Sequence, residues 1–265
     1  MAQPPRRTTA QVENSIREEL GTAGSRMHIL ELERRYKAFM AANFAEGDPR
    51  KLKHGFAFRL SSALARTVAD SLRADFPGIL PDRGRGAESP APVDSGFKRL
   101  DVNYSTVQLG LALGISIKTL NFADEGSRRF TKNATRIDNE LRAEALDYHK
   151  RQPYCVMVAL VFVPKSATGD PGKQGRTSFR HIYEVLTKRS GRSTPGDDME
   201  KFEQIFLATY ESDESAEDYG VLQFAEVIDR EHAANSPRDS LVFDEVIRAV
   251  GATYQRRNPH HRLRT

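Results

Sequence analysis

The chain has 265 residues, of which 38% are hydrophobic and 29% are charged, and its formal net charge is +4. A chain of this length can bury a substantial core in one elaborated domain or two. Its single cysteine, Cys155, excludes an intramolecular disulfide and a Cys-x-x-Cys metal site, and its apolar surroundings favour a buried role. Because no apolar signal segment opens the sequence and the longest apolar run, 154–163, is too short to cross a bilayer, we expect a cytoplasmic protein without a membrane segment.

The N-terminal part of the sequence is predicted to be helical. Apolar residues at helical spacing indicate helices over 11–20, 27–44 and 51–74. The first two form an N-terminal helical extension, residues 1–50, which either covers the core or contacts DNA or a second subunit. Residues 76–97 are rich in Pro, Gly, Asp and Ser without apolar periodicity, so we expect a long loop there.

Two predicted strands each carry a charged side chain. In residues 99–105, Asp101 falls on the polar face, and the apolar face holds Leu100, Val102 and Tyr104. In residues 111–122, one face holds Leu111, Leu113, Ile115 and Ile117, and the other holds Ala112, Gly114, Ser116 and Lys118. A lysine in an apolar strand is costly to desolvate unless an anionic group lies beside it. We therefore expect Asp101 to face Lys118; a purely structural ion pair is the alternative to a catalytic one.

A helix over 136–151 and a strand over 154–163 follow. The buried stripe of this helix is predicted to be Ile137, Leu141, Ala145 and Tyr148. Thr135, three residues before Asp138, predicts a variant capping box. His149 is expected to cap the helix end or lie on the surface, and a contact with substrate is the less favoured alternative. The remaining predicted elements are a helix over 178–188, strands over 202–210 and 219–228, and a helix over 241–250.

This arrangement resembles the PD-(D/E)XK nuclease superfamily, which has the restriction-endonuclease-like fold. The shared order is a helix, an uncertain first strand, the Asp101 strand, the Lys118 strand, a helix and a strand, over about residues 50–165. The resemblance implies an α/β fold with a mixed central sheet flanked by helices. Residues 51–165 would form the nuclease-like core, and residues 166–265 a C-terminal elaboration of the same domain with a basic tail.

In the resemblance, Asp101 matches the family's metal-binding aspartate and Lys118 its catalytic lysine. The family motif Glu-x-Lys is replaced here by Ser116, Ile117 and Lys118. One branch of restriction enzymes has Ser-x-Lys and takes the carboxylate from the following helix. Glu140 and Glu144 flank the stripe of the 136–151 helix and can reach inward. We expect Glu140 to be the ligand because it is nearer the helix start, with Glu144 second.

The implied activity is a Mg²⁺-dependent endonuclease, in which Mn²⁺ can substitute. Asp101 and Glu140 would supply hard oxygen ligands, and the metal would lower the pKa of its bound water. Lys118 would orient or deprotonate the attacking water and stabilise the transition state. Ser116 would contribute a hydroxyl to a metal-bound water.

The expected substrate is double-stranded DNA. The protein would act as a restriction enzyme or as the nuclease subunit of a bacterial anti-phage defence complex. A homodimer is expected for cutting both strands, because two-fold symmetry matches a duplex. Two alternatives stay open. One is a catalytically degenerate nuclease fold that binds DNA or a partner, for which the missing strand glutamate is the evidence. The other is an RNA-directed nuclease of the same fold.

Charge is unevenly distributed along the sequence. A basic group follows the Lys118 strand, and it is expected to contact phosphates or to form a solvated loop: Arg128, Arg129, Lys132 and Arg136. Residues 195–232 are rich in Asp and Glu and would form a partner surface, a DNA mimic or plain solubilising surface.

Overall fold

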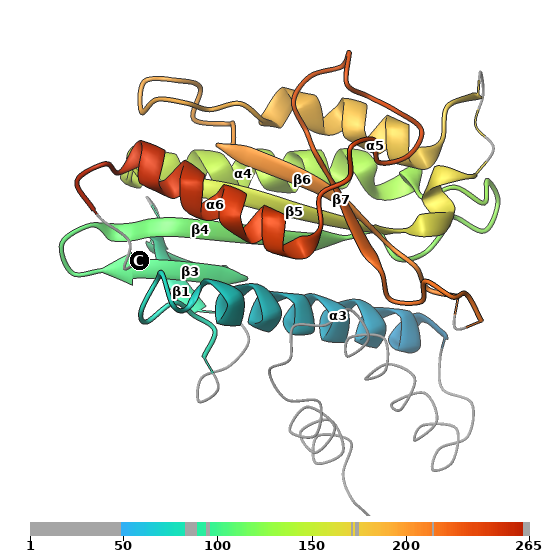
Figure 1. Cartoon of the computed structure of the whole chain (residues 1–265), viewed down its shortest axis with the longest axis horizontal. Helices are drawn as coiled ribbons and strands as arrows, with labels where there is room; N and C mark the ends of the chain where they lie inside the picture. The colour runs from blue at the N-terminus through green and yellow to red at the C-terminus, as the bar shows by residue number, and fades with distance from the viewer. Residues whose placement is uncertain are drawn as a thin grey trace, which may run out of the picture.

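The computed structural model describes residues 49–82, 89–93, 96–170, 172, 175–213 and 215–261. Its centre is a five-stranded mixed sheet in the order β3-β4-β5-β6-β7 (Figure 1). The strands are β3 (Val102–Thr106), β4 (Gly110–Thr119), β5 (Val156–Pro164), β6 (Gln204–Tyr210) and β7 (Leu222–Glu226). β4, β5 and β6 are parallel, whereas β3 and β7 pair antiparallel at the two edges. The predicted α/β fold with a mixed sheet is confirmed at this level.

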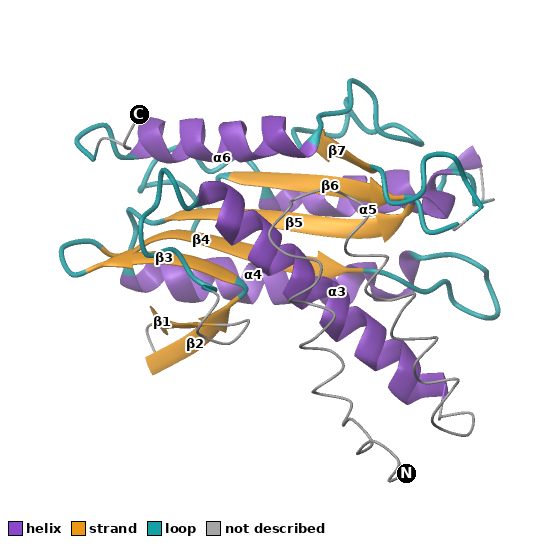
Figure 2. Cartoon of the chain, turned by 60° about the horizontal axis from the view of Figure 1, so that its bottom comes forward, coloured by secondary structure: helices purple, strands orange, loops and turns teal. Residues whose placement is uncertain are grey.

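Helices cover both faces of the sheet (Figure 2). α3 (Pro49–Leu72) and α6 (Phe243–Arg257) share one apolar cluster with the sheet, and α4 (Ala134–Arg151) and α5 (Ser178–Leu186) share the other. Every residue of β5 is buried, as expected for a central parallel strand with both faces covered. Short 3₁₀ turns are η1 (Thr131–Asn133), η2 (Lys165–Thr168) and η4 (Thr187–Arg189).

The helices predicted over 11–20 and 27–44 lie outside the described residues. Within the described ranges, no helix combines the length and the apolar content needed to cross a membrane. β6 and β7 continue the sheet that contains β4 and β5. The predicted core, 51–165, and the predicted C-terminal elaboration, 166–265, therefore contribute strands to the same sheet.

Part of the predicted long loop at 76–97 is a two-stranded ribbon. β1 (Ser89–Val93) pairs antiparallel with β2 (Gly96–Leu100), separate from the main sheet (Figure 2). The loop prediction is wrong here because backbone pairing in a small ribbon does not require apolar periodicity. Pro90 and Pro92 also suggest a loop, although their fixed φ is compatible with a strand that has a free edge.

The alternation predicted for residues 99–105 is interrupted at Asp101, where the chain passes from β2 to β3. Leu100 belongs to the apolar cluster on the α4 side, whereas Val102 and Tyr104 belong to the cluster on the α3 side. The prediction of one common face for these three residues is therefore wrong, because the interruption changes the phase of the alternation.

A bulge changes the face of Leu111 in the same way. Tyr104 pairs with Leu113 and Ser105 pairs with Leu111, which leaves Ala112 as the extra residue on β4. Leu111 consequently packs in the cluster on the α4 side, in contrast to its predicted face. The other predicted members of that face are confirmed on the α3 side: Leu113, Ile115 and Ile117.

The apolar stripe predicted for α4 is confirmed. Its members are buried against the sheet: Ile137, Leu141, Ala145 and Tyr148. Fully burying a side chain such as Leu141 contributes about 1.5–3 kcal/mol. The helix ends at Arg151, shortly before Pro153, because proline disfavours helical backbone in the residue before it.

The capping box predicted at the start of α4 is wrong. The helix begins at Ala134 after Asn133, and no side chain caps it, so Thr135 already lies within the first turn. Asp138 instead accepts a hydrogen bond from Arg189 Nε of η4 at 2.7 Å. This charged contact fixes α4 to the segment that follows α5.

Candidate active site

Ser116 and Lys118 occupy the face of β4 that is turned toward α4. Their chain neighbours Ile115 and Ile117 pack on the α3 side, and side chains alternate between the faces of a strand. Ser116 is buried, and the Lys118 side chain is 16% exposed. The sequence alternation predicted this pair correctly because no bulge lies between Leu113 and Lys118.

Gly114 allows close packing at the inner end of the same face. A Cβ at this position would lie 2.7 Å from Met157 Sδ and 2.9 Å from Leu100 Cδ1. The missing side chain therefore lets Leu100 pack under β4, immediately before Asp101 enters the site.

α4 brings two carboxylates to the strand residues. Glu144 Oε1 accepts a hydrogen bond from Lys118 Nζ at 2.7 Å, and Glu144 Oε2 accepts one from Ser116 Oγ at 2.6 Å. Glu140 lies one helical turn earlier, with Oε2 3.7 Å from Lys118 Nζ, and it also pairs with Arg136 at 3.4 Å. Glu144 thus makes the closer contacts with the strand, whereas the sequence favoured Glu140.

Asp101 is held against the middle of β4. Its Oδ2 accepts a hydrogen bond from the backbone N–H of Ile117 at 2.7 Å. Because Ile117 lies between Ser116 and Lys118, this bond places the Asp101 carboxylate beside both of them along the strand. The predicted approach of Asp101 to the Lys118 strand is confirmed by this contact.

The surrounding carboxylates determine the charge of Lys118. Burial acts to lower the pKa of its ammonium group, but the charge and hydrogen bond of Glu144, then the charges of Asp101 and Glu140, act in the opposite direction. The net result is a Lys118 pKa above its ordinary value of 10.5. Lys118 is therefore a fixed cation at neutral pH: it can attract and hydrogen-bond an anion, but it is a poor acceptor of a proton from water.

Tyr148 adds a buried hydroxyl one turn beyond Glu144. Its side chain is completely buried, and its hydroxyl oxygen has no hydrogen-bond partner among the described residues. Burial, followed by the charge of Glu144, raises the pKa of this hydroxyl, which keeps it neutral. The sequence identified Tyr148 only as a member of the apolar stripe.

Three of the four predicted phosphate-contacting residues form ion pairs: Arg129 lies 4.0 Å from Asp170, and two others pair with carboxylates close in sequence. Lys132 Nζ lies 2.7 Å from Asp124 Oδ1 in the loop before α4. Arg136, in the first turns of α4, pairs with Glu140. Both side chains are largely exposed; Lys132 contacts the loop before α4, whereas the Arg136 pair lies within α4.

The other two basic residues, Arg128 and Arg129, lie in the turn between Asp124 and Phe130. Arg129 donates a hydrogen bond to the carbonyl oxygen of Arg176 at 3.0 Å, which connects this turn to the segment before α5. Arg128 has φ 54° and is exposed, and within the described residues its guanidinium makes no ion pair. Arg128 is thus available to an external anion.

A second charged cluster, at the starts of β5 and β6, was not predicted. Glu203 is fully buried and accepts a hydrogen bond from the Met157 N–H at 2.7 Å. Arg192 and Arg257 approach Glu203 Oε1 to 3.4 and 3.3 Å. The only sequence signal was an acidic residue directly before the apolar run 204–210, which by itself indicates no partner.

The prediction that His149 caps α4 or lies on the surface is wrong. Its ring is completely buried, with Nδ1 3.0 Å from the Met199 carbonyl oxygen and Nε2 3.5 Å from Glu203 Oε2. His149 follows the buried Tyr148 directly, and both side chains face inward at the end of α4. Cys155 is buried beside this cluster, as predicted, and burial raises the pKa of its thiol.

The donor set beside β4 suits a hard cation. Within the part of the chain that the structure describes, no group of three or more His, Cys, Asp or Glu side chains is gathered as a metal site. Asp101 at the Ile117 N–H and Glu144 at the Ser116 hydroxyl nevertheless bring carboxylate oxygens to adjacent residues of β4, and such oxygens are the ligands that Mg²⁺ prefers. Waters complete most protein Mg²⁺ sites, so two carboxylates fit this metal.

No protein-family model, curated protein or solved structure matches this chain.

Proposed function

We propose that this protein is a metal-dependent endonuclease of the PD-(D/E)XK type that hydrolyses phosphodiester bonds in double-stranded DNA. The observation that carries the proposal is the convergence of Asp101, Lys118 and Glu144 on one face of β4, with Glu144 2.7 Å from Lys118. The order of α3, β3, β4, α4 and β5, with β4 parallel to β5, supports a restriction-endonuclease-like core.

Asp101 and Glu144 are the proposed ligands of Mg²⁺, for which Mn²⁺ would substitute. When bound, the metal supplies Lewis-acid activation and a water of lowered pKa. Ser116 Oγ, 2.6 Å from Glu144, orients that carboxylate. Glu140, which the sequence favoured as the ligand, is more exposed and takes an outer position, where it balances Arg136 and Lys118.

Lys118 has the role of a fixed cation in this proposal. Its raised pKa argues against deprotonation of the attacking water. An ammonium group held on a rigid strand can bind a non-bridging phosphoryl oxygen and stabilise the negative charge that develops there in the transition state. The phosphate would take the place that one Glu144 oxygen now occupies beside Nζ, which frees that oxygen for the metal.

A second candidate function is a nuclease fold that binds DNA without cutting it. The observation in its favour is that both Glu144 oxygens are occupied, by Lys118 and Ser116, as in a structural ion pair. The replacement of the family's strand glutamate by Ser116 also favours this second function.

In the cutting proposal, assembly as a homodimer or within a bacterial anti-phage defence complex would place two such sites on the two strands.

A cleavage assay separates these functions. Purified protein is incubated with supercoiled plasmid, linear duplex DNA or single-stranded RNA, with Mg²⁺, Mn²⁺ or EDTA. The expected result is metal-dependent cutting of duplex DNA, with at least about a hundredfold loss in Asp101→Asn and Lys118→Met, the order of a lost charge-stabilising group. Lys53→Met, which removes an exposed lysine on α3, is the matched control and should cut normally. Cutting that persists in both site variants would refute the assignment.

A further inference from the structure

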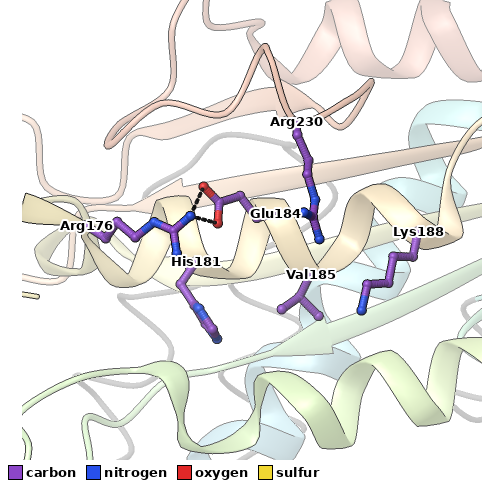
Figure 3. A pocket seen from close by; sticks show the side chains of 6 residues that line it. All are labelled: Arg176, His181, Glu184, Val185, Lys188 and Arg230. Atoms are coloured by element: carbon purple, nitrogen blue, oxygen red, sulfur yellow. Dashed lines mark hydrogen bonds and ion pairs between the residues drawn. The ribbon is translucent and has the colours of Figure 1, made fainter. Parts of the chain in front are cut away.

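A basic pocket of about 190 Å³ lies on α5, on its solvent-facing side (Figure 3). Its lining residues are Arg176, His181, Glu184, Val185, Lys188 and Arg230. Four of them recur at helical spacing along α5 and η4, whereas Arg230 reaches the pocket from the segment after β7 (Figure 3). Two distant parts of the chain therefore form the walls.

The charge of the pocket is unbalanced. Glu184 is neutralised within it, since its carboxylate pairs with Arg176 at 2.9 Å and with Arg180 at 3.0 Å. Lys188 and Arg230 are exposed, and among the described residues neither side chain forms an ion pair. Two cations thus face the pocket without a counter-ion. A space of this volume holds several water-sized groups, which is enough for a tetrahedral oxyanion with its hydration.

The pKa of His181 is affected by the same positive charge around the pocket. Burial, followed by the positive charge of Arg129, lowers the pKa of its imidazole. Arg129 belongs to the turn that follows the Lys118 strand, and it donates a hydrogen bond to the Arg176 carbonyl at 3.0 Å. The basic turn beside the candidate active site is therefore hydrogen-bonded to a residue that lines the pocket.

We propose that this pocket binds a phosphate of the nucleic-acid backbone and so positions the duplex outside the candidate active site. Arg230 and Lys188 would make the direct contacts, and the ion pair with Glu184 would hold Arg176 in place as the third cation. The contacts are sequence-independent, because cations that bind phosphates fix the register of a duplex without reading its bases. The identity of the ligand as nucleic acid rests on the proposed function.

The test measures binding in the absence of cutting. Binding of fluorescently labelled duplexes of two unrelated sequences is followed by anisotropy in EDTA over a range of salt concentrations. We expect Arg230→Gln and Lys188→Gln each to weaken binding about tenfold for both sequences, as for a lost charged hydrogen bond. The slope of log K against log salt should fall by about one unit in each. Arg248→Gln removes an exposed arginine from α6, on the opposite face of the sheet, and is the matched control.

Three results would overturn the inference. One is that the pocket variants bind DNA as Arg248→Gln does. Another is that the loss is confined to one sequence, which would indicate base readout. The third is that the variants retain DNA binding but lose binding to labelled poly-glutamate, which would identify an acidic polypeptide as the ligand. Because this assay contains no metal, its outcome is independent of whether Lys118→Met abolishes cutting.

Discussion

Replacing Glu144 by Gln tests the central contact of the candidate site. The substitution keeps the shape of the side chain and removes its charge. The amide oxygen can still accept a hydrogen bond from Lys118 or Ser116, but the ion pair at 2.7 Å is lost. Lys118 is left with Glu140 at 3.7 Å and with the charge of Asp101.

The expected loss of stability follows from these distances. At an effective dielectric constant of about 20, opposite unit charges attract by about 6 kcal/mol at the Glu144 distance and by about 4 kcal/mol at the Glu140 distance, before desolvation is subtracted. Breaking a buried pair costs about 3–5 kcal/mol when the remaining charge has no other partner. Lys118 keeps a partner and is partly solvated, so we expect Glu144→Gln to lower the free energy of unfolding by about 2 kcal/mol. For a domain of this size the Tm would fall by about 4–8 °C.

Glu140→Gln is the matched variant. The Glu140 side chain is 39% exposed and more distant, so solvent screening limits its effect to about 0.5 kcal/mol. Urea denaturation followed by circular dichroism gives both values. Equal stabilities of wild type and Glu144→Gln, or a larger loss in Glu140→Gln, would refute the assignment of Glu144 as the inner carboxylate.

The ionisation of Lys118 provides a second readout for the same variants. Its folded-state pKa is raised, so the stability that it contributes is fully present below its ordinary pKa of 10.5 and is lost as the pH rises through the folded-state value. The Glu144→Gln substitution removes the charge that mainly opposes the effect of burial on Lys118, so the pKa of Lys118 should fall. NMR of the lysine side chains measures this shift, and an unchanged Lys118 pKa would contradict the role of Glu144 as the main partner of Lys118.

Three further outcomes are expected. Gly114→Ala should lower the free energy of unfolding by about 1–3 kcal/mol, because the new methyl group meets Met157 and Leu100 at less than 3 Å; a neutral effect in urea denaturation would show that these side chains move aside. Cys155 should react with a thiol reagent only on unfolding, since burial raises its pKa, and rapid labelling of the native protein would contradict this. The hydrogen bond from Lys132, followed by those from Ser127, lowers the pKa of Asp124 to about 2. The contribution of Asp124 to loop order is therefore present above pH 3.8 and is lost as the pH falls toward 2. NMR signals of residues 124–129 should move in that pH window, and a transition near pH 4 would contradict the pairing.

Much of the sheet and its helices could be predicted because their signals are local. The alternation in β4 and the stripe of α4 are each set by neighbouring residues of a single element, and together they placed Ser116 and Lys118 correctly opposite α4. The faces of Leu100 and Leu111 were wrong because each depends on one irregularity, the break at Asp101 or the bulge beside Ala112. A single inserted residue reverses the side-chain phase of a strand and leaves no mark on its composition.

The order of the two helix carboxylates was not predictable from position along α4. Glu140 is nearer the helix start, but the reach of a carboxylate depends on the rotation of α4 about its axis, which is set by packing against the sheet. The burial of His149 had the same origin, because its partner Glu203 is 54 residues distant in sequence. Contacts of this kind exist only after the elements have packed.

The cluster around Glu203 has a consequence for the architecture as a whole. α4 and α6 lie on opposite faces of the sheet, yet His149 from one and Arg257 from the other approach the same carboxylate. At this end of the molecule, the two helical layers meet around the ends of the strands at one buried carboxylate, rather than only through the apolar sheet between them. The last turn of α4, the helix that carries Glu144, therefore shares a buried carboxylate with the last turn of α6 on the far face of the sheet, so we expect a chain shortened before Arg257 to be altered at α4 as well as at its end.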